Sequence, residues 1–334
     1  MTAAVAVDLG KTGCRAVLWH DGAGSAPDAH EVPGAPGLAA DQGVELARAA
    51  VRAAVLPLLE GQPELRLAAV CVGAAGAAAA PEAARELAGL LLEDLPADEV
   101  AVTSDAVTAH AGALGGRTGV VLAIGTGSVA VGIGEDGSYA RVDGWGPWLG
   151  DEGSGAWIGA AGLRAALRAH DGRGPDTSLL AAAGARFGDP DRLPSALGRD
   201  GNPARTAAAF APDVARAAAA GDAVAAKIVQ EAAAALGEAV LAAAHRLGGD
   251  DALPVTITGG LTGLGEPLVG PLLAVLAGSA RPLETRPPLG DPLDGARLLA
   301  LDASAPHEPH IARVRRTVSQ PPVPSAPVTP PAVA

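Results

Sequence analysis

Two short glycine turns carry residue types that could hold a phosphate chain. The turn Leu9–Thr12 follows an apolar run ending at Asp8, and the turn Gly125–Ser128 follows the apolar run Gly119–Ile124. Backbone N–H groups bind phosphate where glycine lets the chain come close, and a hydroxyl side chain adds one further hydrogen bond. Two such turns facing each other could grip a triphosphate, with Asp8 holding Mg²⁺ through water. Either segment alone could equally be a plain hairpin turn.

Two further segments could contact a ligand. Six glycines, three tryptophans and two adjacent carboxylates fall within the 17 residues Asp143–Gly159, a composition that predicts a loop shaped by its surroundings. A loop of this kind often holds a ligand, with a turn that covers a core edge as the alternative, and Trp148 and Trp157 could simply be core residues. Gly259-Gly260, after another apolar run, would let a planar base lie against the backbone. The alternative for this pair is an ordinary turn.

The elements that would position these residues alternate between strands and helices, which indicates mixed sheets with helical crossovers. The first half predicts strands over 3–7, 14–19, 28–33, 65–72 and 99–103, a helix over 41–60 capped by Asp41, and helices over 81–92 and after Asp105. The second half predicts strands over 119–124, 129–133, 137–142 and 254–258, helices across 156–247, and helical segments at 267–276 and 296–300. Both halves open with a strand, a glycine turn containing a hydroxyl residue, and a returning strand. This indicates an internal duplication, with a chance match as the alternative.

Composition limits the class of protein. The 334 residues allow about two domains, and 49% hydrophobic with 18% charged residues is typical of a globular chain with a core. A net charge of −13 argues against nucleic acid or an anionic membrane as partner. Short apolar runs, no signal-peptide pattern and only two cysteines favour the cytoplasm. The proline-rich stretch 304–334 is expected to be disordered and outside the fold.

Taken in order, these motifs resemble the actin-like sugar kinases and ATPases, and within them the N-acetylglucosamine kinase branch of the BadF/BadG/BcrA/BcrD group. The resemblance covers roughly residues 3–300 and is carried by Asp8-x-Gly10-x-Thr12, Ser104-Asp105, Gly125–Ser128, Gly144–Ser154 and Thr258–Gly260. It implies two ribonuclease-H-like lobes, each a mixed sheet with helices, that flank a cleft. We expect an N-terminal lobe over 1–115 and a C-terminal lobe over 116–303, with the last helix near 296–300 crossing back to the first lobe. A homodimer is also implied.

The resemblance also implies roles for single residues. Asp105 matches the general base that takes the proton of a sugar 6-hydroxyl, although a residue just before a helix could instead serve as its N-cap. Asp8 matches the Mg²⁺ position. The implied ATP contacts are Gly10, Lys11, Thr12, Thr126, Gly127, Ser128, Gly259 and Gly260. The implied sugar contacts are Asp151, Glu152, Gly127, Gly73, Ala74 and Trp145.

The chain departs from the family pattern on the first lobe. Leu38 stands where relatives commonly carry a sugar-binding Asn, and Ala74-Ala75 replaces hydroxyl residues. These departures leave the exact sugar open. The family branch makes N-acetylglucosamine the first choice of substrate, followed by glucosamine, N-acetylmuramic acid or another hexosamine. Two other readings stay open. An ATPase that activates an acyl-CoA dehydratase or reductase would need exposed thiolates for an iron–sulfur cluster, whereas Cys14 and Cys71 fall in predicted strands. The second of these readings is a catalytically silent sugar or nucleotide sensor. Against it, the sequence shows no added helix-turn-helix region of the kind a repressor would carry, and both Asp8 and Asp105 are present.

Overall fold

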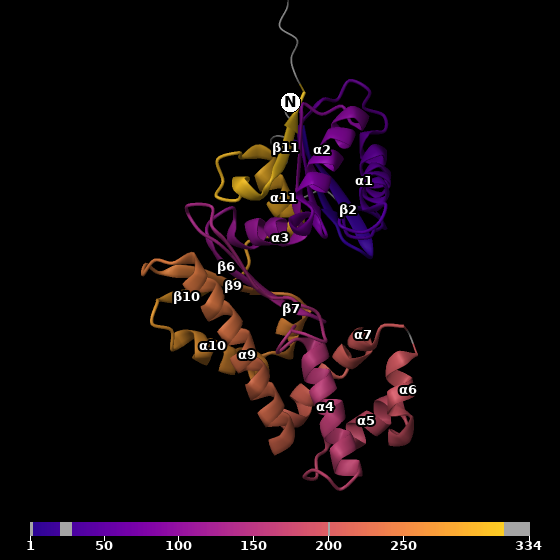
Figure 1. Cartoon of the computed structure of the whole chain (residues 1–334), viewed down its shortest axis with the longest axis vertical. Coiled ribbons are helices and arrows are strands. Elements are labelled where there is room, and N and C mark those ends of the chain that lie inside the picture. The colour runs from indigo at the N-terminus through magenta and orange to yellow at the C-terminus, as the bar shows by residue number, and fades with distance from the viewer. Residues whose placement is uncertain (1–2, 21–28, 200, 317–334) are drawn as a thin grey trace, which may run out of the picture.

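The computed structural model describes residues 3–20, 29–199 and 201–316, which form two lobes along the long axis of the molecule (Figure 1). Each lobe contains one mixed sheet, in the strand orders β11-β5-β4-β1-β2-β3 and β10-β9-β6-β7-β8. The first sheet comprises β1 (Ala3–Leu9), β2 (Gly13–His20), β3 (His30–Pro33), β4 (Leu67–Ala74), β5 (Glu99–Ser104) and β11 (Ala312–Arg315). The second comprises β6 (Gly119–Ile124), β7 (Ser128–Ile133), β8 (Tyr139–Asp143), β9 (Leu253–Thr258) and β10 (Leu283–Arg286). The predicted two-lobed α/β fold is confirmed.

The two sheets repeat one design. In the first, β1 pairs antiparallel with β2 and parallel with β4, while β2 pairs antiparallel with β3 and β4 parallel with β5. In the second, β6 pairs antiparallel with β7 and parallel with β9, while β7 pairs antiparallel with β8 and β9 parallel with β10. Strand order and direction therefore match strand for strand, which confirms the predicted duplication. The strand β11 is an addition to the first sheet.

Apolar helix faces bury the sheets. In the first lobe, α1 (Gly43–Leu59) and α2 (Pro81–Asp94) share a core with β1 and β4, and the 3-10 helix η1 (Ala77–Ala79) precedes α2. The predicted cap of α1 by Asp41 is wrong. The N-cap position is Gln42, which has a φ of 54° and makes no side-chain cap bond. The first helical residue must be a glycine, because a Cβ at Gly43 would lie 2.7 Å from the carbonyl oxygens of Gly37 and Leu38.

The second lobe inserts a helical subdomain between β8 and β9, in line with the helices predicted across 156–247. It comprises α4 (Gly155–His170), α5 (Leu179–Phe187), η2 (Pro190–Arg192), α6 (Leu193–Gly198), α7 (Pro203–Ala208), α8 (Ala211–Ala219) and α9 (Ala223–Leu247). The helix α9 packs on β6, β7 and β8. After β9 come η3 (Gly260–Leu264) and α10 (Glu266–Ala277). Within the described residues, none of the helices has the length and apolar character needed to span a membrane.

The last helix of each lobe packs against the other lobe. The helix α3 (Asp105–Leu114) follows β5 of the first sheet, and it contacts β6, β7 and β9 of the second sheet as well as β1, β4 and β5 of its own. Conversely, α11 (Pro292–Leu301) follows β10 of the second sheet but packs on β1, β2 and β4 of the first. The two helices also pack on each other, and Figure 1 shows them at the junction of the lobes. This exchange holds the two sheets at a defined separation.

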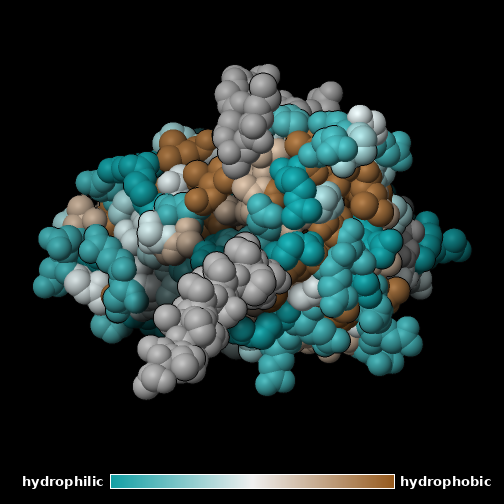
Figure 2. Space-filling model, turned by 90° about the horizontal axis from the view of Figure 1, so that it is seen from above, coloured by the Kyte–Doolittle hydropathy of each residue, from teal (hydrophilic) through white to brown (hydrophobic). Residues whose placement is uncertain are grey.

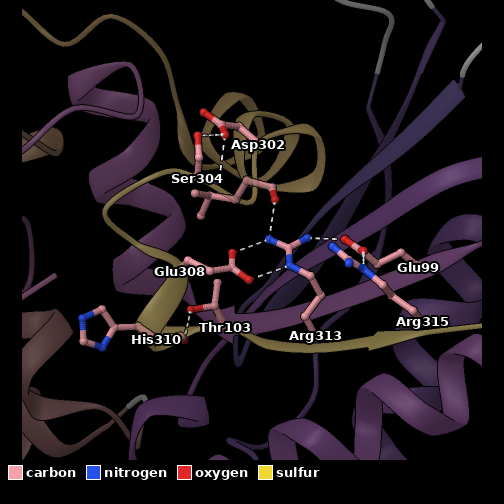
Figure 3. A network of polar contacts seen from close by, with 9 residues as sticks. Glu99, Thr103, Asp302, Ser304, Glu308, His310, Arg313 and Arg315 are labelled. Atoms are coloured by element: carbon pink, nitrogen blue, oxygen red, sulfur yellow. Dashed lines mark hydrogen bonds and ion pairs between the residues drawn. The ribbon is translucent and has the colours of Figure 1, made fainter.

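The segment after α11 belongs to the first lobe, so the expectation that residues 304–334 lie outside the fold is wrong for 304–316. Here η4 (Glu308–His310) leads into β11, which pairs antiparallel with β5. The nearly buried Arg313 contacts the carboxylates of Glu99 and Glu308 and donates to the carbonyl of Leu299 at 3.0 Å, while Arg315 also reaches Glu99 (Figure 3). Expected disorder over 317–334, and residue 28 of the third predicted strand, lie outside the described residues.

Viewed from the first-lobe end, hydrophilic residues cover much of the surface and hydrophobic residues appear between them in separate areas (Figure 2). The largest exposed apolar side chains lie instead on the second lobe, in the loop after β8, where Trp148 and Leu149 are 87% and 86% exposed. The loop singled out by its composition therefore holds the two most exposed large apolar side chains of the described residues.

Candidate active site

A cleft of about 720 Å³ collects the predicted motifs from both lobes. The first lobe contributes Asp8, Lys11, Ala75, Gly76 and Asp105. The second contributes Gly125, Gly127, Ser128, Asp151 and Gly259. These residues are spread over some 250 positions, and they meet because β1, β5, β6 and β9 all end at the cleft. The geometry combines two glycine turns, two carboxylates from the first lobe and one from the second.

Asp105 opens α3 without serving as its cap. The N-cap is Ser104, whose hydroxyl oxygen accepts a hydrogen bond from the amide of Val107 at 3.3 Å. The carboxylate of Asp105 accepts a hydrogen bond from the neighbouring amide of Ala106, at 2.9 Å. Burial, followed by the negative charge of Asp8, raises the pKa of Asp105 above its ordinary value. The alternative N-cap reading is therefore wrong, and Asp105 lines the cleft with a strengthened basicity.

Asp8 lies at the end of β1 beside the first turn. Arg15, its partner on β2, donates to the carboxylate at 2.7 Å and lies 3.7 Å from Asp291. Lys11 lines the same part of the cleft and is exposed. In the described part of the chain no three His, Cys, Asp or Glu side chains cluster as a metal cage. One partly exposed carboxylate at the cleft fits a hydrated Mg²⁺, which takes few protein ligands when phosphates complete its shell.

The second turn is held by the start of α4. The amides of Gly155 and Ala156 donate to the carbonyls of Gly125 and Thr126 at 2.8 and 3.1 Å. The hydroxyl of Ser128 donates to the carbonyl of Glu152 at 2.9 Å, so this proton is already used to position the loop. The backbone of the turn still faces the cleft through Gly125 and Gly127. A phosphate contact by Ser128 stays a prediction.

The loop after β8 is folded around two carboxylates in left-handed backbone conformations, Asp143 at a φ of 62° and Asp151 at 54°. Asp143 accepts the amides of Asp151 and Glu152 at 2.7 and 2.8 Å, while Asp151 accepts the amide of Gly146 at 3.1 Å. These bonds offset strain of about 1–3 kcal/mol at such positions. Burial raises the pKa of Asp151. A Cβ at Gly127 would lie 2.6 Å from this carboxylate, so glycine is required where the loop meets the second turn.

The tryptophans of this loop differ in environment. Trp145 is 66% exposed, with the guanidinium of Arg141 5.1 Å from its ring centroid. Trp148 is almost fully exposed, so its reading as a core residue is wrong. Trp157, on α4, packs partly buried against the helical core. Only Trp157 fits the buried alternative.

The third turn lies against the second lobe's first strand. Gly259 has a φ of 98°, and a Cβ there would lie 2.2 Å from the carbonyl oxygen of Ile124. Gly260 begins η3. Among the predicted contacts, those that do not line the cleft are Gly10, Thr12, Gly73, Ala74, Thr126, Trp145, Glu152 and Gly260. Gly10 closes the first turn instead, donating its amide to the carbonyl of Gly13 at 2.9 Å.

Gly73 and Ala74 are predicted as sugar contacts, but neither residue lines the cleft. Both are buried in β4, and a Cβ at Gly73 would lie 2.2 Å from the hydroxyl of Thr108, so this glycine lets α3 approach the sheet. The next residues, Ala75 and Gly76, line the cleft in their place. Leu38 is buried in the first-lobe core, where its amide donates to the carbonyl of Ala75 at 3.0 Å. An apolar residue at this position supports the loop rather than a ligand.

Tyr139 and Arg141 line the cleft but were not predicted. They lie on β8, where residues two apart share a face of the sheet. The alternation in Gly137–Val142 was the signal that could have found them. Both cysteines are fully buried in the first sheet, Cys14 on β2 and Cys71 on β4, and burial raises the pKa of each thiol to about 12. They are unsuited to hold an iron–sulfur cluster.

Two duplicated α/β lobes, with facing glycine turns and a third turn on the second lobe, define an actin-like fold of the sugar kinase and ATPase type. The model of the BadF/BadG/BcrA/BcrD ATPase family matches residues 5–272, and the chain belongs to this family.

Individual relatives agree with that assignment. The chain is 32% identical over 124 residues to an N-acetylmuramic acid/N-acetylglucosamine kinase of Clostridium acetobutylicum, covering 36% of this chain and 39% of the relative. It is 39% identical over 79 residues to an N-acetyl-D-glucosamine kinase of Dictyostelium discoideum, covering 23% of this chain and 25% of the relative. These matches span well under half of the curated relatives. A solved structure of a candidate N-acetylglucosamine kinase from Chromobacterium violaceum is 30% identical, with a TM-score of 0.66, over 90% of this chain and 99% of that one.

Proposed function

We propose that the protein is an ATP-dependent amino-sugar kinase that phosphorylates the 6-hydroxyl of N-acetylglucosamine, glucosamine or a related hexosamine. The observation that carries the proposal is the cleft, where Asp105 lies among the glycine turns of both lobes and Asp151. Phosphoryl transfer needs mainly positioning and charge stabilisation, and this arrangement supplies both. The proposal is further supported by the family of the chain and by the sugar kinases among its relatives.

Each group has a defined task in the proposed reaction. The sugar 6-oxygen attacks the γ-phosphorus, the bond from that phosphorus to the bridging oxygen of ADP breaks, and Asp105 takes the hydroxyl proton. The raised pKa makes Asp105 a better acceptor for this proton. Lys11 and the amides of Thr126 and Gly127 would neutralise phosphate charge, and Asp151 would accept sugar hydroxyls. Mg²⁺, held through Asp8, supplies charge neutralisation on the phosphates.

The same proposal covers the setting in which the enzyme works. We infer a first lobe over 1–115 that residues 304–316 complete, a second lobe over 116–303, a homodimer, and a cytoplasmic location. The adenosine would lie at Gly259 and Gly260, where the backbone closely approaches Ile124.

The decisive experiment is an ATP-consumption assay with Mg²⁺ over a panel of hexosamines, with phosphorylated products identified by mass spectrometry. Sugar-dependent ADP release with at least one hexosamine, and a product that lacks a free 6-hydroxyl, is expected. If no hexosamine accelerates ATP consumption, the kinase proposal fails. A 6-deoxy sugar serves as the matched substrate control, because it can bind without reacting.

A further inference from the structure

A second cavity of about 290 Å³, here called the C-terminal cavity, lies beside the active-site cleft. One wall is formed by Pro309–Ala312, where η4 leads into β11. Ala78, Ser104 and Tyr139 line both this cavity and the active-site cleft. Ser104 immediately precedes Asp105, with Cα atoms about 3.8 Å apart. The cavity therefore adjoins the cleft, and a group carried by a sugar bound in the cleft could reach it.

The walls of the C-terminal cavity are mainly apolar. Alanine and aliphatic side chains from α2, β5, α3 and the C-terminal segment supply most of the lining, namely Ala84, Val102, Val107 and Ile311 among others. The hydroxyl of Thr103 is already used, since it donates to the carbonyl of His310 at 2.8 Å. The Nε2 of His310 is likewise paired with the carbonyl of Gly137 at 2.8 Å. Such walls would leave the hydroxyls of a second sugar ring without partners, at a cost of about 1–3 kcal/mol each.

Arg85 gives this apolar cavity a positive charge. Arg85 is exposed on α2, and it is the lining residue that carries a permanent charge. Its side chain forms no hydrogen bond or ion pair with the described residues. The chain as a whole is acidic, with a net charge of −13. An anionic ligand would therefore be repelled unless a specific cation met it. Arg85 lies where it can meet a carboxylate after the alkyl part of the group has packed on the apolar wall.

The wall is held rigidly enough to select a shape. Arg313 ties the C-terminal segment to β5 through Glu99 and to η4 through Glu308, while His310 ties it to the second lobe at Gly137 (Figure 3). Figure 3 shows His310 and Arg313 extending from opposite ends of the same strip of chain. Supporting contacts of this kind fix the geometry of a subsite.

We propose that the C-terminal cavity is a subsite for a short alkyl carboxylate carried by the amino sugar, with Arg85 as the residue that selects the negative charge. N-acetylmuramic acid, an N-acetylglucosamine bearing a lactyl ether, has this chemistry. The proposal rests on the sugar-kinase function proposed above and narrows its substrate class. It assigns Arg85 to specificity and gives it no part in phosphoryl transfer.

The test compares N-acetylmuramic acid, its methyl ester and N-acetylglucosamine as substrates for the wild type, Arg85→Met, Arg85→Glu and Arg85→Lys. We expect kcat/KM for N-acetylmuramic acid to fall about 5- to 10-fold in Arg85→Met, to fall further in Arg85→Glu, and to be largely kept in Arg85→Lys. Rates with the ester and with N-acetylglucosamine should stay unchanged. Arg199→Met, at an exposed arginine outside both cavities, is the matched control.

The outcomes separate the two proposals. If N-acetylglucosamine is phosphorylated while N-acetylmuramic acid neither reacts nor binds in calorimetry, the subsite proposal is overturned and the kinase function stands. Equal losses with charged and neutral sugars in Arg85→Met also overturn it. If no sugar is phosphorylated, the proposed function fails, and calorimetry of N-acetylmuramic acid against wild type and Arg85→Glu still decides the subsite. Binding weakened by Arg85→Glu and by added salt would support it, whereas equal binding would overturn it.

Discussion

Gly112 on α3 and Gly295 on α11 face each other at the crossing of the two exchanged helices, and neither leaves room for a side chain on the other. A Cβ at Gly112 would lie 1.9 Å from the carbonyl oxygen of Asp291, and a Cβ at Gly295 would lie 1.9 Å from that of Thr108. Backbone therefore packs on backbone. Asp105 opens one of these helices, so the crossing fixes the proposed base relative to both sheets.

Gly112→Ala and Gly295→Ala should each destabilise the protein by about 1–3 kcal/mol, because overpacking outweighs the better helix propensity of alanine. Gly89→Ala is the matched control, since Gly89 lies inside α2 with nothing within 4 Å of an added Cβ. That variant should be neutral or stabilised by about 0.5–1 kcal/mol. Urea denaturation measures all three. Equal effects at the three glycines would contradict the close crossing.

Asp105→Asn should lower kcat about 10²- to 10⁴-fold while leaving ATP and sugar binding in place, because the amide keeps the shape but cannot take the proton. Glu86→Gln, at an exposed carboxylate on α2, should keep the wild-type rate. Single-turnover kinetics with calorimetric binding constants separate the two effects. A variant that retains nearly all of its rate would remove Asp105 from the role of base.

Asp8→Asn should raise the Mg²⁺ concentration needed for half-maximal rate. It should also move the acidic limb of the kcat/KM profile to lower pH, because the charge of Asp8 helps to raise the pKa of Asp105. Asp291→Asn is the control, as it removes the other carboxylate near Arg15 while asparagine still caps α11. Titration of Mg²⁺ and a pH–rate series check both effects. An unmoved Mg²⁺ requirement would argue against Asp8 as the metal-positioning group.

Arg313→Met should destabilise the protein by about 3–5 kcal/mol, since Glu99 and Glu308 would keep partly buried charges without their partner. The Arg313 side chain is 8% exposed and that of Glu99 is 13% exposed. Arg315 contacts the same Glu99 but is 67% exposed, so Arg315→Met should cost less than about 1 kcal/mol. Chemical denaturation compares the pair. Similar losses in both variants would show that the contribution of Arg313 does not come from its burial.

A buried histidine pair should make the protein less stable in acid. Nε2 of His110 lies 3.0 Å from the carbonyl of Gly119 and therefore carries the proton, so Nδ1 accepts from Nε2 of His307 at 2.9 Å. Burial lowers the pKa of His110 to about 4 and, with the charges of His110 and His310, that of His307 to about 3. The unfolded chain, with pKa values near 6.5, binds more protons in this range. Stability is therefore full above about pH 6.5 and falls as the pH drops toward about 4.

The matched variant is His307→Gln, which keeps an N–H donor for His110 but cannot be protonated. Its melting temperature should drop less than that of the wild type between about pH 7.5 and about pH 5. Thermal melts over a pH series measure the difference. Parallel pH dependences would mean that His307 is not titrating as its burial requires.

Local patterns were enough to predict most of the fold and the general place of the site. Glycine turns after apolar strands and the repeated hairpin indicated two related lobes. The failures came from long-range packing. Nothing around Arg313 in sequence indicates that it would meet Glu99, 214 positions earlier, so β11 was missed. The short strand β10 is mostly exposed and lacks an apolar run, so no local pattern indicates it, and only its pairing with β9 defines it as a strand.

The site shows the same limit at the level of single side chains. The segment after β4 was correctly placed near the cleft, but one residue of register decides which side chains face it. Gly73 serves α3 packing through Thr108, and the cleft is reached only at Ala75. Similarly, the spacing Ser104-Asp105 cannot tell which residue caps the helix. Backbone geometry at the first turn of α3 assigns the cap to Ser104 and frees Asp105.

The pairing of β11 with β5 has a consequence for the order in which the chain folds during synthesis. The ribosome delivers β1 to β5 first, but the outer edge of β5 has no strand to pair with until residues 312–315 emerge. Until then the edge offers unpaired backbone groups to any neighbouring nascent chain. The first lobe to be made is thus the last to be completed, and a chaperone that shields β5 would act throughout translation of the entire second lobe.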